Sequence, residues 1–281
     1  MDLESQKSRL AAKIITDLLV AILLHVSALL IPLAGRPTRG FFCDDYTIRY
    51  PYKPDTVSTV GVGLYGYLIP LLLVRLVKNL IFCLQIIIVE ILIATYKRCA
   101  DGDYNSFKKA WPPIYNYGIA FFIAGGLTLS VTTVIKYSLG RLRPHFIDAC
   151  QPDKFTINCT GFIDHYTCQN TDQKIVKDAF LSFISGHSSI ASAGIVFAVL
   201  YLQSRLQLKP TPLVRPLVQA VLISTCLYIG FTRVTDFKHH PTDVLGGFVL
   251  GSLCSITVVS PDRSQFIRTL FFLAYALISL E

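Results

Sequence analysis

Three short stretches of the sequence hold residue types that could bind and cleave a phosphate ester. They are 136–144 (KYSLGRLRP), 185–189 (SGHSS) and 233–243 (RVTDFKHHPTD). Each lies at the edge of a long apolar run, and together they combine cations, histidines and one carboxylate. Cations and N–H donors can hold a phosphate, and an imidazole can act as nucleophile or proton donor. The pattern therefore indicates chemistry on a phosphate group at a membrane surface.

Phosphate binding needs several fixed donors, because a phosphomonoester carries about −1.5 to −2 charge near neutral pH. Arginine offers planar bidentate donors, and lysine offers a point charge. Backbone amides at the beginning of a helix offer further donors, where the helix dipole favours an anion. We assign this role to Lys136, Arg143, Arg233, Ser185 and Gly186, and we expect Arg141 to face lipid headgroups instead.

The catalytic groups are expected among the histidines. His239 and Asp243 are four residues apart at the beginning of an apolar run, a spacing that can place them on one helix face. Asp243 could hold the imidazole tautomer that leaves the other ring nitrogen of His239 free to attack phosphorus. His187 would then protonate the leaving alkoxide. His240, three residues before Asp243, is the competing nucleophile.

The composition is that of a membrane protein. Of 281 residues, 52% are hydrophobic and 16% are charged, whereas soluble domains have about 25% charged residues. The net charge of +8 comes from cations in short loops beside the apolar runs, as the positive-inside rule predicts. We expect phosphorylated lipids and the membrane as partners and no nucleic acid, since no basic stripe is interleaved with aromatic residues. Whether the chain forms a homo-oligomer stays open.

Metal chemistry is not expected. The sequence has no cluster of carboxylates with metal-ligand spacing, and its cysteines lack the spacing of a zinc site. We therefore predict neither a bound metal nor an organic cofactor.

The apolar runs predict an all-α fold, a polytopic membrane helix bundle with six transmembrane helices and both termini cytosolic. Twenty helical residues rise about 30 Å, which matches the hydrocarbon core of a bilayer. The region 57–96 could hold two short spans or one span and an interfacial helix, and the basic loop 97–113 favours one crossing. The predicted spans are 14–33, one within 57–96, 114–135, 180–202, 217–231 and 244–259.

The spans predict one membrane-embedded domain over 1–281 with its core at 10–260. With a cytosolic N-terminus, each predicted span carries the chain to the opposite side of the membrane. Counting the spans places the loop 136–179 on the exoplasmic side, and the stretches 185–189 and 233–243 are on that side too. The last apolar run of the tail 261–281 is too short to cross, so we expect it to lie in the interface.

Disulfides are expected on the exoplasmic side, with the pairing left open among Cys43, Cys150, Cys159 and Cys168. Asn158 begins an Asn-Cys-Thr acceptor triplet in the same large loop, so we expect it to carry a glycan.

The three stretches resemble the signature motifs of the type 2 phosphatidic acid phosphatase superfamily, and the chain is similar to its animal lipid phosphate phosphatases over roughly residues 10–260. Residues 136–144 match the first motif, Lys-x6-Arg-Pro. The second motif, Pro-Ser-Gly-His, is matched except that Ile184 replaces the proline. The third, Ser-Arg-x5-His-x3-Asp, is matched except that Thr232 replaces the serine.

The resemblance implies an enzyme that hydrolyses phosphatidate, lysophosphatidate, sphingosine 1-phosphate and ceramide 1-phosphate without Mg²⁺, in phospholipid metabolism and lipid signalling. It also implies a phosphohistidine intermediate on His239, with Asp243 orienting the ring and His187 acting as acid and later as base. We expect the plasma membrane as the location, with the site facing the extracellular or lumenal side, and endomembranes as the alternative.

Three other classes of protein share part of this pattern. A non-catalytic scaffold or lipid-binding relative would not need His187, His239 and Asp243, all of which are present. A transporter or channel would place ionisable residues in mid-span, whereas most charges here lie at span ends. Vanadate-dependent peroxidase chemistry uses a similar oxyanion pocket, but a six-span setting argues against it.

Overall fold

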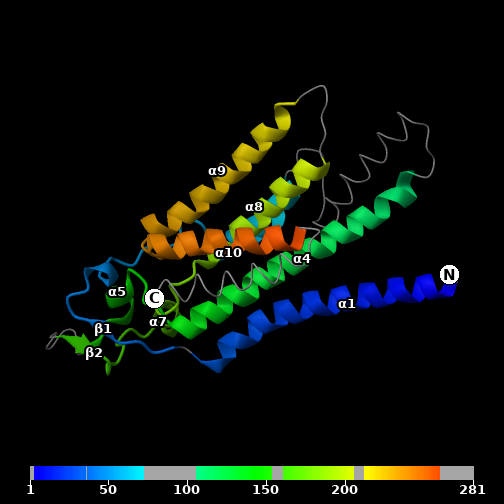
Figure 1. The fold of residues 1–281 in the computed structure, drawn as a ribbon. Helices are drawn as coiled ribbons and strands as arrows, with labels where there is room; N and C mark the ends of the chain where they lie inside the picture. Colours follow the sequence, from blue (N-terminus) through cyan, green and yellow to red (C-terminus); the bar gives the residue numbers. More distant parts are fainter. Residues whose placement is uncertain (1–2, 36, 73–105, 154–160, 206–211, 260–281) are drawn as a thin grey trace.

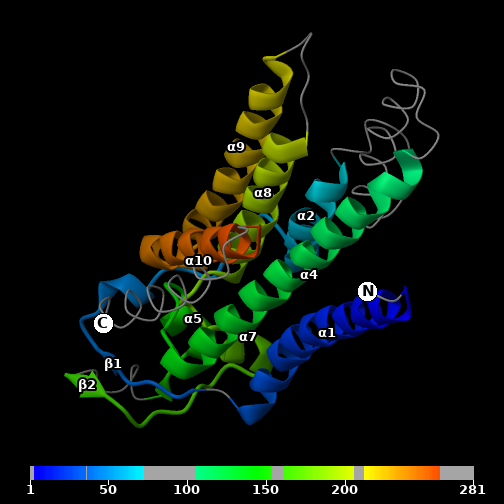
Figure 2. The ribbon, with the colours of Figure 1, turned by 45° about the vertical axis from the view of Figure 1, so that its right-hand side comes forward.

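The computed structural model describes residues 3–35, 37–72, 106–153, 161–205 and 212–259. In these ranges long helices run side by side, and the short elements gather at the end of the bundle away from the beginning of α1 (Figures 1 and 2). In chain order the elements are α1 (Leu3–Leu30), η1 (Ile31–Ala34), β1 (Phe41–Phe42), η2 (Tyr46–Ile48), α2 (Thr59–Leu72), α4 (Ser106–Leu139), α5 (Phe146–Cys150), β2 (Phe162–Ile163), α7 (Gln173–Asp178), α8 (Gly186–Arg205), α9 (Val214–Thr235) and α10 (Pro241–Val259).

Within the described residues, five helices are long and apolar enough to cross a membrane. Their candidate spans are Ser8–Ala34, Tyr115–Leu139, Gly186–Ser204, Val214–Thr235 and Pro241–Val259. They overlap five of the predicted spans, although the span predicted from residue 180 begins too early, since helix α8 begins at Gly186. The remaining prediction, one crossing within 57–96, begins with α2, and its part from residue 73 lies outside the described residues, as does the tail 261–281.

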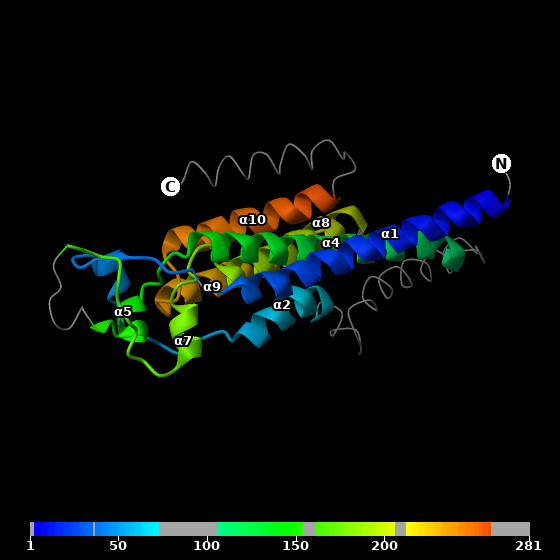
Figure 3. The same ribbon diagram turned by 90° about the horizontal axis from the view of Figure 1, so that it is seen from below.

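Helix α8 is the centre of the bundle and packs against α2, α4, α9 and α10, whereas α1 packs against α4 (Figure 3). The closest approach joins α8 to α10: a Cβ atom on Gly251 would overlap the backbone oxygen of Ser189. Only glycine fits there, as in other closely packed membrane helices. Nearer the beginning of α10, a Cβ atom on Gly247 would likewise meet the backbone oxygen of Ser185, so the beginning of α8 packs along the first half of α10.

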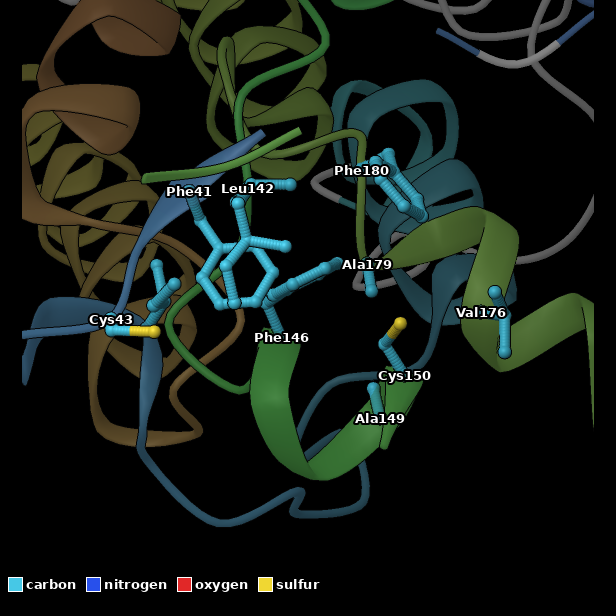
Figure 4. Packing of buried hydrophobic residues seen from close by; sticks show 11 residues of the cluster. Phe41, Cys43, Leu142, Phe146, Ala149, Cys150, Val176, Ala179 and Phe180 are labelled. Carbon is cyan, nitrogen blue, oxygen red and sulfur yellow. The ribbon is translucent and has the colours of Figure 1, made fainter. Parts of the chain in front are cut away.

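The short elements form what we call the loop layer, residues 37–58, 140–153 and 161–185. Strands β1 and β2 pair antiparallel, with Phe41 opposite Ile163. Beneath them lies a cluster of buried side chains (Figure 4), namely Phe41, Cys43, Ile48, Leu142, Phe146, Ala149, Cys150, Ile163, Val176, Ala179 and Phe180. Since Arg143 and Asp178 are adjacent in sequence to members of this cluster, its packing fixes the backbone that carries them.

A disulfide between Cys150 and Cys168 ties two parts of the loop layer together. Cys43 is disulfide-bonded as well. Both findings agree with the predicted use of these cysteines, while Cys159 and the predicted glycan acceptor Asn158 lie outside the described residues.

Candidate active site

A cavity of about 320 Å³ lies where the helices meet the loop layer. Six of the predicted site residues line it: Lys136, Arg143, Gly186, His187, Arg233 and His239. A larger hollow of about 630 Å³ lies in the loop layer, but its lining, which includes Asp153, Asp164 and Thr167, contains none of these cations. The three candidate stretches therefore meet in the smaller cavity.

His239 and Asp243 face each other at the beginning of α10. His239 Nδ1 is 3.6 Å from Asp243 Oδ2, which is longer than a hydrogen bond but within reach of a charge contact. Both side chains are buried. Because Nδ1 is on the side of the carboxylate and the ring lines the cavity, Nε2 is the nitrogen left to act on a bound group.

The beginning of α10 explains why Asp243 is held there. Pro241 is the first helical residue, where a missing N–H and a fixed φ suit the helix. Asp243 reaches back and accepts the backbone N–H of His240 at 2.9 Å, an arrangement like a capping box. It also accepts the hydroxyl of Ser182 at 2.5 Å. These two hydrogen bonds hold the Asp243 carboxylate in place independently of its contact with His239.

Arg141 makes a further contact to this carboxylate, with Nη1 2.6 Å from Asp243 Oδ1. The prediction that Arg141 faces lipid headgroups is therefore wrong. The physical reason is that a fully buried carboxylate needs a compensating charge, and Arg141 supplies one. Nothing in the sequence indicated that Arg141 or Ser182 contacts Asp243.

His187 and Arg233 approach each other from different helices. His187 is the second residue of α8, and its Nε2 is 3.3 Å from Arg233 Nη1. Arg233 lies in the last turn of α9 and not in the following loop as predicted, since the helix continues to Thr235. Asp236, just after the helix, holds Arg233 Nη2 at 2.5 Å. Asp236 thus orients the guanidinium of Arg233 through Nη2, while Nη1 faces His187 in the cavity wall.

Ser185 has a different place from the other predicted phosphate-binding residues. It is fully buried, and its hydroxyl accepts the backbone N–H of Ser188 at 3.4 Å, as an N-cap of α8 does. Its own backbone N–H donates to the carbonyl of Asp243 at 3.0 Å. The cavity wall contains the neighbouring Gly186 and not Ser185.

Two cavity arginines are each paired with an acid that sequence reasoning missed. Arg143 Nη2 is 2.6 Å from Asp178 Oδ1, and Arg233 Nη1 is 3.2 Å from Asp55 Oδ1. Both acids line the cavity. The second pair is separated by 178 residues, so no local pattern could have indicated it.

Two residues of the cavity wall, Arg143 and Arg233, have buried nitrogens that could donate a hydrogen bond to an anion. Among the described residues, Arg143 Nε and Arg233 Nε have no hydrogen-bond partner. Buried donors are normally paired, and an oxyanion in the cavity would accept from both guanidinium groups. Lys136 adds a third cation, although its Nζ also donates to the carbonyl of Leu181 at 2.7 Å.

Burial holds the pKa of His239 well below its ordinary value, and the Arg143 guanidinium lowers it further, against the opposing effect of Asp243. The ring is therefore neutral near pH 7, the form in which an imidazole nitrogen is nucleophilic. Burial alone would raise the pKa of Asp178, but Arg143 and Lys136 bring it below its ordinary value. That side chain stays ionised as a counter-ion.

One part of the cavity wall is apolar. Pro32, Val62 and Ile190 contribute from η1, α2 and α8. The cavity thus combines a cationic end, suited to a phosphate, with a side that suits hydrocarbon.

Comparisons with known proteins agree with these features. The profile of the PAP2 superfamily matches residues 115–264. Phospholipid phosphatase 1 of Rattus norvegicus is 37% identical over 222 residues, covering 79% of this chain and 74% of the relative. Phospholipid phosphatase 2 of Mus musculus is 34% identical over 251 residues, covering 88% and 84%, and that of Homo sapiens is 34% identical, covering 88% and 81%.

No solved structure gives a significant match to the chain. The family profile spans more than half of the sequence, and these relatives align over more than two thirds of their own length. The chain is an integral membrane protein that belongs to the PAP2 superfamily.

Proposed function

We propose that this protein is a lipid phosphate phosphohydrolase that removes the phosphate from phosphatidate, lysophosphatidate, sphingosine 1-phosphate and ceramide 1-phosphate, and so acts in phospholipid metabolism and lipid signalling. The observation that carries the proposal is the shared cavity of His187, His239 and three cations beside an apolar wall. The similarity to proteins named phospholipid phosphatases supports the same activity.

In the proposed first step, Nε2 of His239 attacks phosphorus, and the bond from phosphorus to the lipid oxygen breaks. Lys136, Arg143 and Arg233, with the backbone of Gly186, hold the phosphate oxygens as charge builds on them. His187 gives its proton to the leaving alkoxide, so the lipid departs as an alcohol. The product of this step is a phosphohistidine on His239.

In the second step, His187, now neutral, takes a proton from water while the water oxygen attacks the phosphohistidine. The phosphorus–nitrogen bond breaks, inorganic phosphate leaves, and both histidines return to their starting forms. Asp243 keeps the Nδ1 side of His239 oriented through both steps, supported by its short contacts to Ser182 and the backbone of His240.

The proposed mechanism needs no Mg²⁺, because histidine and arginine supply the nucleophile and the charge stabilisation. Its support is the donor set: the described residues contain no group of three or more His, Cys, Asp or Glu side chains that could hold a metal ion. Arginine and lysine cannot serve as ligands for a hard cation such as Mg²⁺.

The proposed topology has six spans, both termini in the cytosol, a single domain over 1–281 and the cavity on the exoplasmic side, in the plasma membrane. Its support is that the loop layer lies at the end of the bundle away from the basic beginning of α1 (Figure 1). Such a topology exposes Asn158 to glycosylation. Glycosidase treatment should shift the mobility of the wild type and not of Asn158→Gln; a wild type that shows no shift would count against the glycan and weaken the topology.

The test of function is release of inorganic phosphate by the purified full chain, presented with a panel of the four lipid phosphates and excess chelator. We expect turnover of the wild type and of Asn158→Gln, and none from His239→Ala. Turnover near the wild-type level in His239→Ala would refute the assignment, and dependence on added Mg²⁺ would refute the metal-free mechanism.

A further inference from the structure

The cavity that binds the phosphate also contains an acidic side chain that the proposed chemistry does not use. Asp55 lies outside the three motifs and outside the part of the chain that the family profile matches. Its side chain is 36% exposed, and Oδ1 is 3.2 Å from Arg233 Nη1 and 3.7 Å from Lys238 Nζ. A carboxylate at this place repels a phosphate dianion, so its presence needs a reason.

The loop layer holds Asp55 firmly in place. The next residue, Thr56, donates its backbone N–H to Asp236 Oδ2 at 2.8 Å and its hydroxyl to Asp236 Oδ1 at 2.6 Å. Asp236 in turn pairs with Arg233, so the segment that carries Asp55 is attached to the arginine that would bind phosphate. On the other side, the buried Lys238 lies 3.8 Å from the ring centroid of Tyr52. The position of Asp55 is therefore built into the fold.

The contacts of Asp55 leave part of its carboxylate available. Among the described residues, its hydrogen bond and both of its ion pairs involve Oδ1, and Oδ2 makes no hydrogen bond. A carboxylate has about four acceptor sites on its two oxygens. Oδ2 can therefore accept from a bound molecule without giving up Arg233.

The distance from Asp55 to the phosphate position limits what that molecule is. Two acceptors on one guanidinium nitrogen, each at about 3 Å, lie about 5 Å apart. Arg233 Nη1 also faces His187 Nε2 at 3.3 Å, and a protonated His187, as the proposed first step requires, cannot accept from it. A phosphate oxygen would then take that second position on Nη1 and have this separation from Asp55. A cation two carbons from the phosphate ester oxygen fits between them, because it lies within reach of both.

We propose that Asp55 is a headgroup-selecting residue that binds an ammonium group carried two carbons from the ester oxygen of a lipid phosphate. This inference rests on the proposed function and names the substrate class that the cavity favours. For such a lipid, the ammonium offsets the repulsion between Asp55 and the phosphate. For a lipid phosphate without a cation, the repulsion remains, and kcat/KM is lower.

The test compares two lipids that differ only at the nitrogen. Short-chain sphingosine 1-phosphate carries the ammonium, and the matching ceramide 1-phosphate carries a neutral amide on the same carbon. We expect Asp55→Asn to lower kcat/KM for the ammonium lipid about tenfold, the scale of one hydrogen bond to a charged group, and to leave the amide lipid unchanged or faster. Asp55→Glu, which keeps the charge, should retain most of the preference.

Asp178→Asn is the matched control, because Asp178 is the other carboxylate of the cavity wall and pairs with the other arginine. It should not shift the ratio between the two lipids. An equal change for both lipids in Asp55→Asn, or the same shift of the ratio in Asp178→Asn, would overturn the inference. A wild type that hydrolyses neither lipid would count against the proposed function itself.

A second measurement needs only the wild type and does not depend on a variant folding. Phosphoethanolamine carries an ammonium at the proposed spacing, and n-propyl phosphate has a methyl group in its place. We expect phosphoethanolamine to be the stronger competitive inhibitor, by about tenfold. Equal inhibition constants would contradict a cation site beside the phosphate.

Discussion

Arg141 and Asp243 form an ion pair of 2.6 Å that joins the first motif to the third. Arg141 is not part of the wall of the candidate active-site cavity; it lines a separate hollow of about 270 Å³, together with Arg39. Arg141 thus contacts one oxygen of the Asp243 carboxylate, Oδ1, while the other oxygen, Oδ2, faces His239. Asp243 connects an outer cation to the proposed nucleophile.

Replacing Arg141 by Gln should lower kcat about tenfold to a hundredfold, since it removes a charge-assisted hydrogen bond from a buried carboxylate. The fall should be mainly in kcat, because Arg141 does not line the phosphate cavity. It should also change the pH–rate profile, because the positive charge next to the His239–Asp243 pair is lost. Steady-state kinetics across pH, with added guanidinium to restore activity, would check this.

The control for that variant is Arg39→Gln, which lines the same hollow and donates to the carbonyl of Leu139 at 3.1 Å. It should leave kcat and the pH profile unchanged. If Arg39→Gln and Arg141→Gln behave alike, the charge of the hollow, and not the contact with Asp243, is what matters.

His187→Ala and His239→Ala should differ when the leaving group needs no proton. With p-nitrophenyl phosphate, whose phenolate leaves unaided, His187→Ala should still form the phosphohistidine, whereas His239→Ala should not. Rapid mixing would then show a burst of nitrophenolate in His187→Ala alone. A burst in His239→Ala would place the nucleophile elsewhere, with His240 the first alternative.

The stability of the loop layer should fall between about pH 6.5 and pH 4 because of His145. Burial lowers the pKa of His145 to about 4, while its Nδ1 lies 2.7 Å from the carbonyl oxygen of Phe237. The unfolded chain binds this proton first as pH falls, so the contribution is full above pH 6.5 and is lost toward pH 4. The loss reaches about 3 kcal/mol.

Thermal unfolding in detergent at several pH values would measure that loss. His145→Gln should flatten the dependence in this window, at some cost in stability at pH 7. His165, whose side chain is 88% exposed, provides the control, and His165→Gln should follow the wild type. A slope as steep in His145→Gln as in the wild type would assign the acid sensitivity to other groups, such as His239, whose pKa is also lowered.

Gly251→Ala should destabilise the bundle by about 1–3 kcal/mol, the usual cost of overpacking. The new methyl group would meet the backbone of Ser189 and force α10 away from α8. Gly118→Ala on α4 is the matched control, because a Cβ there meets nothing within 4 Å, and it should be neutral or slightly stabilising. Equal unfolding temperatures for the two variants would contradict the close packing.

The sequence predicted which residues meet in one cavity better than it predicted the ion pairs among them. The motif residues Lys136, His187 and His239 lie at the edges of apolar runs, which predicts that they lie near helix ends. Counting the predicted membrane crossings then places those ends on the same side of the bilayer. These are local patterns, and the shared cavity agrees with them. Single residues at element boundaries were less predictable, as Arg233 shows by lying within α9.

The missed residues share one cause. Asp55 and Asp178 pair with arginines from other elements, and Arg141 reaches a carboxylate 102 residues further along. Such pairs depend on how whole segments pack, which no short window of sequence contains. Ser185 shows the converse: its motif position suggested ligand binding, but its hydroxyl and amide are used inside the fold.

The apolar wall of the cavity, formed in part by Pro32, Val62 and Ile190, has a consequence for where the two products go. A substrate that keeps its acyl chain along that wall never has to leave the bilayer to be dephosphorylated. Afterwards the alcohol diffuses away in two dimensions, while the phosphate is diluted into the aqueous volume. Because the two products enter different phases, they rarely meet again at the cavity.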